Sequence, residues 1–253
     1  MEGYSQNLIQ LHAEEREAHI YRVFSIRRLI ELFAIRKNTL VRPKLWDDPF
    51  ENFILKSLYE IESGESVRIG FKDQLYGQCW SLVRDSDALW RIYSPDKNGV
   101  RVRSKIRVLF ESLWNTCVSS MRTPSCFIGK VEYLPQKKIL EILDRSGLVT
   151  GALLDNTGRG QVSTLLMKRR EFSHEKEVRL VYFNHDDAYT LDIFQYDVDP
   201  GALFDEITFD PRLSDELFEV YKTHFERLGF PGSINRSPLY RVPEFKGKLR
   251  TQL

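Results

Sequence analysis

The run Met167–Phe183 constrains the fold of this chain more than any other stretch. It begins with charged residues and ends in Val178–Phe183, which holds β-branched and aromatic residues and no Gly or Pro, as is typical of a strand. If the strand begins near Glu175, its two-residue period places Glu175, Glu177 and Arg179 on one face. Two carboxylates and a guanidinium then share one small area. This pattern predicts either a catalytic cluster at the mouth of a sheet or a solvated face laced with ion pairs.

The overall composition is that of an ordinary globular protein. The chain has 253 residues, of which 42% are hydrophobic and 29% charged, so it can build one large domain or two small ones. It contains no apolar run near the roughly 20 residues needed to cross a bilayer, and Met1–Ser5 lacks the basic and apolar regions of a signal peptide. We therefore expect a cytoplasmic protein with no membrane partner.

Cysteine content argues against a disulfide-rich or Cys-rich zinc protein, and net charge argues against a uniformly basic nucleic-acid binder. Cys79, Cys117 and Cys126 are odd in number and lack metal-ligand spacing, so we expect buried thiols and no disulfide framework or Cys-rich zinc site. A net charge of +1 argues against a uniformly basic nucleic-acid binder. The basic runs Lys168–Arg170 and Lys246–Arg250 are either phosphate contacts or solvated faces.

Strand and helix signals are irregularly mixed along the chain, which has no repeats and no linker. We predict a helical lead-in over residues 1–19, one α+β domain over 20–242 and a basic tail over 243–253. Short strands in a mixed or antiparallel sheet, flanked by helices, should form the core. We expect Tyr189–Val198 to form a hairpin with the Val178 strand, and Gly147–Gln161, which has no phosphate-loop pattern, to be a mobile loop.

Three further segments carry candidate site residues. The predicted strand His19–Phe24 sets Arg22 among apolar residues, as a surface cation or an anion-holding group. A second strand ends at Ser81, and the helix and turn after it bring Trp90 and Tyr93 into the same neighbourhood. Each aromatic residue is explained either as core or as part of a site.

The segment before a predicted helix from Pro49 to Ile61 is rich in carboxylates. Asp48 is in position to cap this helix, and Glu51, three residues later, is in capping-box position. The alternative interpretation is a metal-dependent nuclease, in which oxygen ligands hold Mg²⁺. That site would draw on Asp47, Asp48, Glu51, His174 and Glu177.

The order and spacing of several segments resemble the microbial family called domain of unknown function 2971, from about residue 20 to residue 242. The matching segments are Ile20–Phe24, Leu45–Glu51, Cys79–Ser81 with Leu89–Tyr93 and Gly99–Val100, Lys168 with Phe172 and Glu175–Leu180, and Glu206–Ile207 with Asp210–Pro211. This chain departs from that pattern at Asp47, Trp80 and Asp210, where the family usually has Asn, Phe and often Gly. A role in conflict between microbes and phages, as a toxin or in phage defence, is one expectation for such a protein.

A second resemblance is to the Arg–Ser–Glu pattern of the ADP-ribosyltransferase superfamily, with NAD as substrate. It implies that Arg22 holds a phosphate or ribose of NAD, that Ser81 sets the nicotinamide half, and that Glu177 binds the ribose hydroxyl. Glu175 would then orient the acceptor. The intervals between these residues are longer than in compact members, and Ser81 lacks the usual Ser-Thr-Ser context.

The chemistry of NAD cleavage fits these residue types. A carboxylate stabilises the oxocarbenium-like transition state formed when nicotinamide leaves, and Arg179 would keep Glu177 ionised. Trp90 or Tyr93 would stack on the nicotinamide ring. The resemblance therefore predicts an NAD-dependent ADP-ribosyltransferase or an NAD-cleaving enzyme with a protein, nucleic-acid or small-molecule acceptor. A nuclease and a non-catalytic binding module remain alternatives, and the oligomeric state is not predicted.

Overall fold

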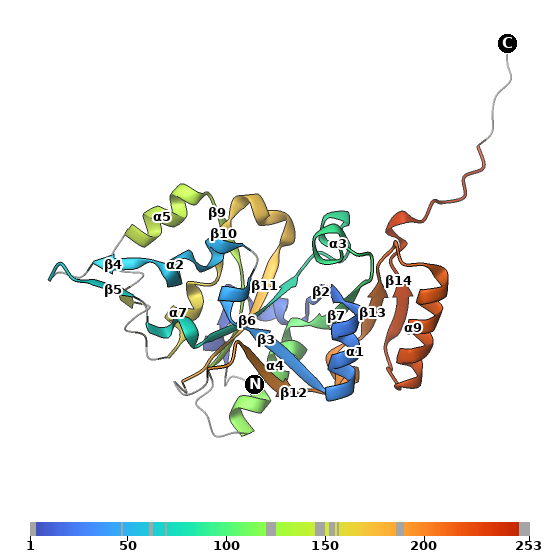
Figure 1. Cartoon of the computed structure of the whole chain (residues 1–253), viewed down its shortest axis with the longest axis horizontal. Helices are drawn as coiled ribbons and strands as arrows, with labels where there is room; N and C mark the ends of the chain where they lie inside the picture. The colour runs from blue at the N-terminus through green and yellow to red at the C-terminus, as the bar shows by residue number, and fades with distance from the viewer. Residues whose placement is uncertain are drawn as a thin grey trace, which may run out of the picture.

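A mixed sheet runs through the centre of the molecule (Figure 1). The computed structural model describes residues 4–46, 48–60, 63–68, 70–119, 125–144, 150–151, 155, 157–185 and 190–247. The strands of the large sheet in these ranges are β1 (Leu8–Ile9), β2 (His19–Ser25), β3 (Lys37–Val41), β6 (Leu75–Ser81), β7 (Gly99–Lys105), β8 (Cys126–Lys130), β11 (Glu177–Phe183), β12 (Ile193–Asp197), β13 (Glu206–Phe209) and β14 (Ser233–Arg236). Two short ribbons accompany it: β9 (Glu132–Leu134) with β10 (Met167–Arg169), and β4 (Leu58–Glu60) with β5 (Ser66–Arg68).

The strand order of the large sheet is β1-β8-β11-β6-β2-β7-β13-β14, and β3 joins β12 to β6. The β1–β8 and β13–β14 pairs are parallel, and the other pairs are antiparallel. This is the mixed sheet of an α+β protein, as the irregular mixture of strand and helix signals predicts.

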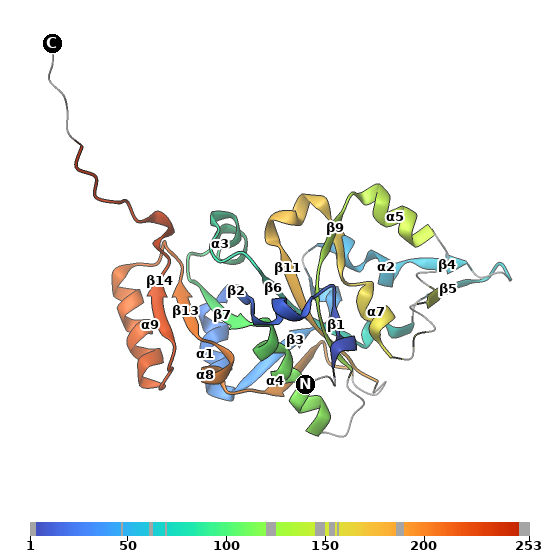
Figure 2. The same cartoon turned by 180° about the vertical axis from the view of Figure 1, so that it is seen from behind.

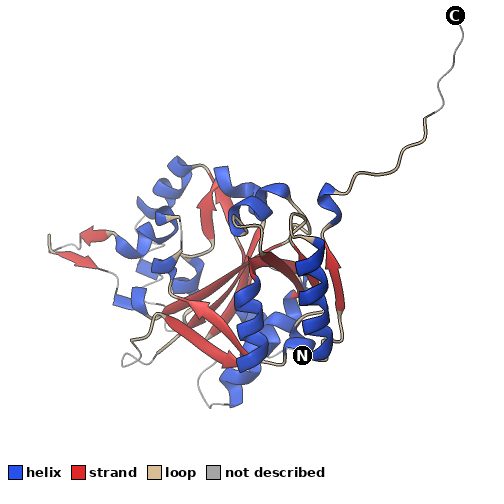
Figure 3. Cartoon of the chain, turned by 45° about the vertical axis from the view of Figure 1, so that its right-hand side comes forward, coloured by secondary structure: helices blue, strands red, loops and turns tan. Residues whose placement is uncertain are grey.

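Helices cover the sheet on both sides (Figure 3). They are α1 (Ile26–Ile35), α2 (Phe53–Lys56), α3 (Asp87–Tyr93), α4 (Ile106–Ser119), α5 (Gln136–Asp144), α7 (Arg159–Ser163), α8 (Pro200–Leu203) and α9 (Asp215–Arg227). Helix α1 buries Ile26, Leu29 and Leu32 at helical spacing and ends where Arg36 turns left-handed. Figures 1 and 2 show α9 and β14 at one end of the molecule and the β4–β5 ribbon at the other.

Strand β11 is the centre of the sheet, and all of its residues are buried. It pairs with β6 along one edge and with β8 along the other. It begins at Glu177, so the prediction that it starts near Glu175 is wrong. Lys176 has φ +43°, which bends the chain, and Glu175 ends the 3₁₀ helix η6 (Arg170–Glu175) that precedes the strand.

The predicted hairpin between Tyr189–Val198 and Val178–Phe183 is also wrong. Because β6 and β8 already occupy both edges of β11, no edge is left for another strand. Strand β12 pairs instead with β3, from Ile193↔Val41 to Asp197↔Lys37. Residues 186–189, in the predicted turn, lie outside the described residues.

Two other local predictions differ from the structure, and the prediction of a mobile loop at Gly147–Gln161 is not tested. Residues 4–19 form the 3₁₀ turns η1 (Ser5–Asn7) and η2 (Ala13–Glu17) and strand β1, and not one helix. The predicted Pro49–Ile61 helix is the 3₁₀ turn η4 (Pro49–Asn52) followed by α2 and β4. Most of Gly147–Gln161 lies outside the described residues, and its described end enters α7.

The C-terminal segment leaves the body after the 3₁₀ turn η7 (Pro238–Tyr240), and residues 241–247 are exposed (Figure 1). Within the described ranges, no helix has the length and apolar character needed to span a membrane. The division of the chain at residues 19 and 242 stays a prediction.

The sheet is split between β2 and β6. These two strands pair only at Tyr21↔Ser81, whereas β2 pairs with β7 from His19↔Lys105 to Ser25↔Gly99. Beyond Tyr21 the strands diverge, so side chains and backbone that a continuous sheet would bury face an open space. A cavity lined by both strands lies at this point.

Candidate active site

A cavity of about 460 Å³ lies in the split between β2 and β6, a volume suited to a small-molecule ligand. Its floor includes residues 21–23 of β2 and 77–81 of β6, and α3 forms one wall. Trp46 lies on the floor against Gly77, where an added Cβ would be 2.6 Å from Cζ2 of the indole, so this close packing requires glycine. The facing wall comes from β10, η6 and the start of β11.

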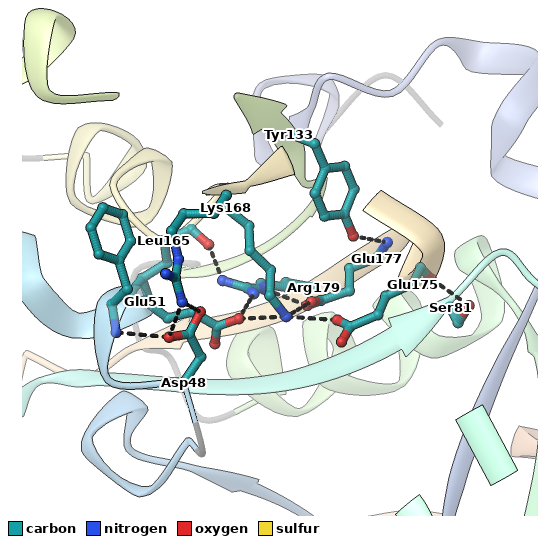
Figure 4. A network of polar contacts seen from close by, with 11 residues as sticks. Asp48, Glu51, Ser81, Tyr133, Leu165, Lys168, Glu175, Glu177 and Arg179 are labelled. Atoms are coloured by element: carbon teal, nitrogen blue, oxygen red, sulfur yellow. Dashed lines mark hydrogen bonds and ion pairs between the residues drawn. The ribbon is translucent and has the colours of Figure 1, made fainter. Parts of the chain in front are cut away.

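Five buried charged residues on that facing wall form a cluster that we call the acidic network: Glu51, Lys168, Glu175, Glu177 and Arg179 (Figure 4). The Lys168 ammonium lies 2.7 Å from Oε1 of Glu51, 2.6 Å from Oε2 of Glu175 and 2.6 Å from Oε1 of Glu177. Arg179 donates to Oε2 of Glu177 (2.8 Å) and Oε1 of Glu51 (2.9 Å). Three carboxyl groups therefore face two cations.

Because of this imbalance, Glu175 and Glu177 have different pKa values. Burial acts to raise the pKa of Glu177, but the charge of Arg179 and hydrogen bonds from Glu175 and Arg179 hold it well below its usual range. Burial, together with the hydrogen bond and negative charge of Glu177, raises the pKa of Glu175 to about 8. Glu177 is thus the anion of the pair, and the raised pKa keeps Glu175 mostly protonated at neutral pH.

Arg22 reaches the same cavity from β2 and forms no ion pair with any acidic residue that the structure describes. No hydrogen bond or ion pair joins it to any residue in the described part of the chain, and its guanidinium lies 5.2 Å from the Phe24 ring centre. Burial lowers the pKa of Arg22 to about 10, which still leaves it charged at neutral pH. A partly buried cation without a counter-ion is suited to an anionic ligand.

Ser81, at the end of β6, fixes the backbone of the acidic network. Its hydroxyl donates to the carbonyl of Glu175 at 2.6 Å and accepts from the amide of Val83 at 2.9 Å. The amide of Glu177 donates to the Tyr133 hydroxyl at 2.8 Å, as Figure 4 shows. These contacts hold both sides of the bend at Lys176.

The two candidate aromatic residues differ in exposure. Trp90 is 1% exposed, and its indole nitrogen donates to Asp85 at 2.6 Å, so it mainly supports the cavity wall. Tyr93 is 41% exposed and also lines the cavity. The geometry therefore favours Tyr93 over Trp90 as a stacking surface.

A second cluster of charged residues, the Arg101 network, surrounds the buried Arg101 where β7 meets β13. Arg101 donates to Glu206 at 2.7 Å and to Thr208 at 2.9 Å, and lies 3.4 Å from Asp85. Arg103 and Arg84 reach Glu206 at 3.2 and 3.6 Å. With Asp205, which pairs with Arg103, this network has three carboxylates and three arginines among the described residues.

The structure brings the predicted site residues together. Arg22, Ser81, Trp90, Tyr93, Glu175 and Glu177 line the cavity, and Arg179 lies behind Glu177 with no exposed surface. Their roles in catalysis and NAD binding stay predictions. The sequence reasoning did not assign a site role to Lys168, although its position in the charged approach to β11 was a signal.

The predicted capping box at Glu51 is wrong in part. Asp48 does cap η4, accepting from the amide of Phe50 at 3.0 Å. Glu51 instead turns inward to Lys168 and Arg179, because these buried cations offer it stronger partners than a backbone amide.

The nuclease interpretation would use many of the same carboxylates. Both cations of the acidic network already lie against Glu51 and Glu177, and no group of three or more His, Cys, Asp or Glu in the described part of the chain is arranged to hold a metal ion. Asp47 lies outside the described residues.

Comparisons with known proteins gave only distant structural similarity. No family model and no curated protein matches the chain, so the resemblance to domain of unknown function 2971 stays a prediction. Solved structures of Thermus sp. 2.9 DarT are similar over 87% of this chain. The complex with ADP-ribosylated ssDNA has a TM-score of 0.39, 14% identity and 94% of its chain covered. The complex with NAD+ has a TM-score of 0.37, 15% identity and 96% of its chain covered. At TM-scores below 0.5, the case for function rests on the cavity's own residues.

Proposed function

We propose that this protein cleaves the bond between nicotinamide and ribose in NAD and transfers the ADP-ribose to an acceptor. The observation that supports this most strongly is the composition of the cavity. Arg22, a cation without a counter-ion among the described residues, lines the cavity from β2, and a buried carboxylate, Glu177, lines it from the start of β11. A ligand that carries both phosphate and a sugar able to become cationic matches both groups.

Arg22 and Tyr93 are the groups we assign to binding. The planar guanidinium of Arg22 would hold a phosphate oxygen pair, which also supplies the counter-ion that this residue lacks. Tyr93 would offer its ring to the nicotinamide. Ser81 would act indirectly, since its hydroxyl is already engaged by the backbone of Glu175 and Val83.

Glu177 and Glu175 are the groups we assign to the reaction. When the C–N bond breaks, nicotinamide leaves with the electron pair and positive charge develops on the ribose, which the anionic Glu177 would stabilise. Glu175, in the fraction of molecules in which it is ionised, would take the proton that the acceptor loses as its new bond to the ribose forms. With a pKa of about 8, part of the Glu175 population is ionised near the working pH and can act as this base.

The acceptor is water, a protein or a nucleic acid in this proposal. A non-catalytic binding module would use the same cavity without turnover. The two functions differ in one measurable product, free nicotinamide.

The test is nicotinamide release from NAD by the purified protein, followed by chromatography, with labelled NAD plus protein or single-stranded DNA to detect transfer. We expect Glu177→Gln to lower kcat at least about 100-fold, because the neutral amide cannot stabilise the developing charge. Arg22→Ala should instead raise KM for NAD by about tenfold or more, because it removes a charged contact to phosphate.

Matched controls are Glu219→Gln and Arg27→Ala, which change exposed residues outside the cavity. Release at the wild-type rate by Glu177→Gln would refute the proposal. Binding of NAD without any release by the wild-type protein would favour the binding module.

A further inference from the structure

Lys168 lies at the centre of the acidic network, but the proposed function assigns it neither to NAD binding nor to the reaction. It lies on β10, which pairs with β9 and not with the main sheet, and its side chain is only 6% exposed. Its ammonium contacts three carboxyl groups within 2.7 Å and lies 4.6 Å from the Phe172 ring centre. A lysine buried in this way loses hydration, so its placement needs these partners.

Lys168 and Arg179 divide the network between them. Arg179 has no exposed surface, donates to the carbonyl of Leu165 at 2.6 Å and stacks 4.6 Å from the Trp46 ring centre. It reaches Glu51 and Glu177 but forms no ion pair with Glu175. Among the cations of the described residues, Lys168 is the one that forms an ion pair with Glu175.

We propose that Lys168 is the positioning residue of this site, which holds the Glu175 carboxyl at the cavity wall beside Glu177. The inference rests on the proposed function, because it assigns Lys168 to the reaction through Glu175. Lys168 itself needs no contact with NAD. Its ammonium orients the residue that would receive the acceptor's proton.

Glu51 completes this arrangement by balancing the charge of Lys168 and Arg179. With Glu175 protonated, the network has two cations, Lys168 and Arg179, and two anions, Glu51 and Glu177. Replacing Glu51 with Gln leaves a surplus of positive charge, so Glu175 should ionise more easily. Replacing Lys168 as well removes the cation that contacts Glu175, so Glu175 should ionise less easily than in the wild type.

Other groups also face Glu175 and stay constant in this comparison. They are Glu177 on β11, Tyr93 on α3 and Tyr133 on β9. Burial, followed by the negative charge of Glu175 and Glu177, raises the pKa of Tyr93, and burial, followed by the negative charge of Glu177, raises that of Tyr133. The opposite shifts expected from the two variants therefore isolate Lys168 from these neighbours.

The first measurement does not need enzymatic activity. The melting temperature of each protein is compared with that of the same protein carrying Glu175→Gln, from pH 5 to 9, so that the difference reports the ionisation of Glu175. Relative to the wild type, we expect the midpoint of this difference to move to lower pH in Glu51→Gln and to higher pH in Lys168→Met with Glu51→Gln. The double variant keeps the network neutral, which protects its folding.

The second measurement is nicotinamide release by the same variants. The double variant should lose at least about tenfold in kcat while KM for NAD stays within about threefold, because Arg22 still holds the phosphate. Lys168→Arg should recover part of the kcat, since it restores a cation beside Glu175. Lys137→Met, an exposed lysine outside this cavity, is the matched control.

The outcomes separate this inference from the proposed function. Absence of nicotinamide release by the wild-type protein refutes the proposed reaction, and the melting-temperature midpoints then decide whether Lys168 controls Glu175. Unchanged midpoints in the double variant refute the inference, whether or not the wild-type protein is active. Unchanged kcat in a folded double variant also refutes it.

Discussion

The acidic network and the Arg101 network are clusters of charged residues around the buried Arg179 and Arg101, but they differ in charge balance. In the Arg101 network three arginines face three carboxylates, and in the acidic network two cations face three carboxyl groups. A balanced cluster is satisfied without further protons or ligands. An unbalanced cluster holds a proton that can move, which is what acid–base chemistry needs. Charged residues that alternate along a buried strand can therefore belong either to a balanced structural cluster or to an unbalanced one suited to acid–base chemistry. All of their partners must be known to distinguish the two.

The largest effect on the free energy of unfolding is expected when the central arginine of each network is replaced. Arg179→Met leaves Glu51 and Glu177 sharing Lys168, so we expect a loss of about 3–5 kcal/mol in the free energy of unfolding. Arg101→Met leaves Glu206 within reach of Arg103 and Arg84, so we expect about 1–3 kcal/mol. Urea denaturation followed by tryptophan fluorescence measures both.

Arg27→Met is the control for this pair, because Arg27 is exposed and belongs to neither network. If Arg101→Met cost as much as Arg179→Met, the difference in charge balance would have no energetic consequence. The comparison between the networks would then fail.

The next effect concerns pH. The pKa of Glu175 is raised in the folded protein to about 8, so the folded state binds more protons than the unfolded state between about pH 4.5 and 8. Stability contributed by protonated Glu175 is complete below pH 4.5 and is lost as pH rises through 8. Glu175→Gln, which resembles the protonated form, should therefore melt at about the wild-type temperature at pH 5 and about 10 °C higher at pH 8.

Glu206→Gln sharpens this contrast within the Arg101 network. Glu206 faces three arginines and is needed as an anion, so its variant should melt below the wild type at every pH from 5 to 8. Parallel profiles of melting temperature against pH for Glu175→Gln and the wild type would show that folding does not raise the pKa of Glu175.

Much of the fold follows from local sequence signals. The strands at β2, β6 and β11 are predicted from the sequence, because runs of β-branched and aromatic residues without Gly or Pro at their ends favour buried strands. The partner of β12 is not predicted, since the choice depends on β8 occupying the second edge of β11. That contact joins segments far apart in the chain, and no local pattern records it.

The sequence predicts only part of the site, again because contacts between segments far apart in the chain decide which groups meet. Glu175 and Glu177 stand out because they adjoin a strand, but the expected shared strand face is wrong, and Lys168 is what joins their carboxyl groups. Glu51 satisfies a capping rule in the sequence and a buried ion pair in the structure. Sequence spacing cannot choose between these partners, because the choice depends on two cations supplied by residues more than a hundred positions away.

The smallest effects are expected from removing one hydroxyl beside each network, those of Ser81 and Thr208. Ser81→Ala removes the bonds to the Glu175 carbonyl and the Val83 amide, and Thr208→Val removes the oxygen that bonds Arg101 and Glu206. Each should cost about 1 kcal/mol in the free energy of unfolding, the usual value for a hydroxyl hydrogen bond. Only Ser81→Ala should also lower kcat for nicotinamide release, because the Ser81 hydroxyl fixes the bend that places Glu175. Equal kcat values in the two variants, at matched stability, would show that the backbone at Glu175 needs no such support and that the two networks do not differ in function at this point.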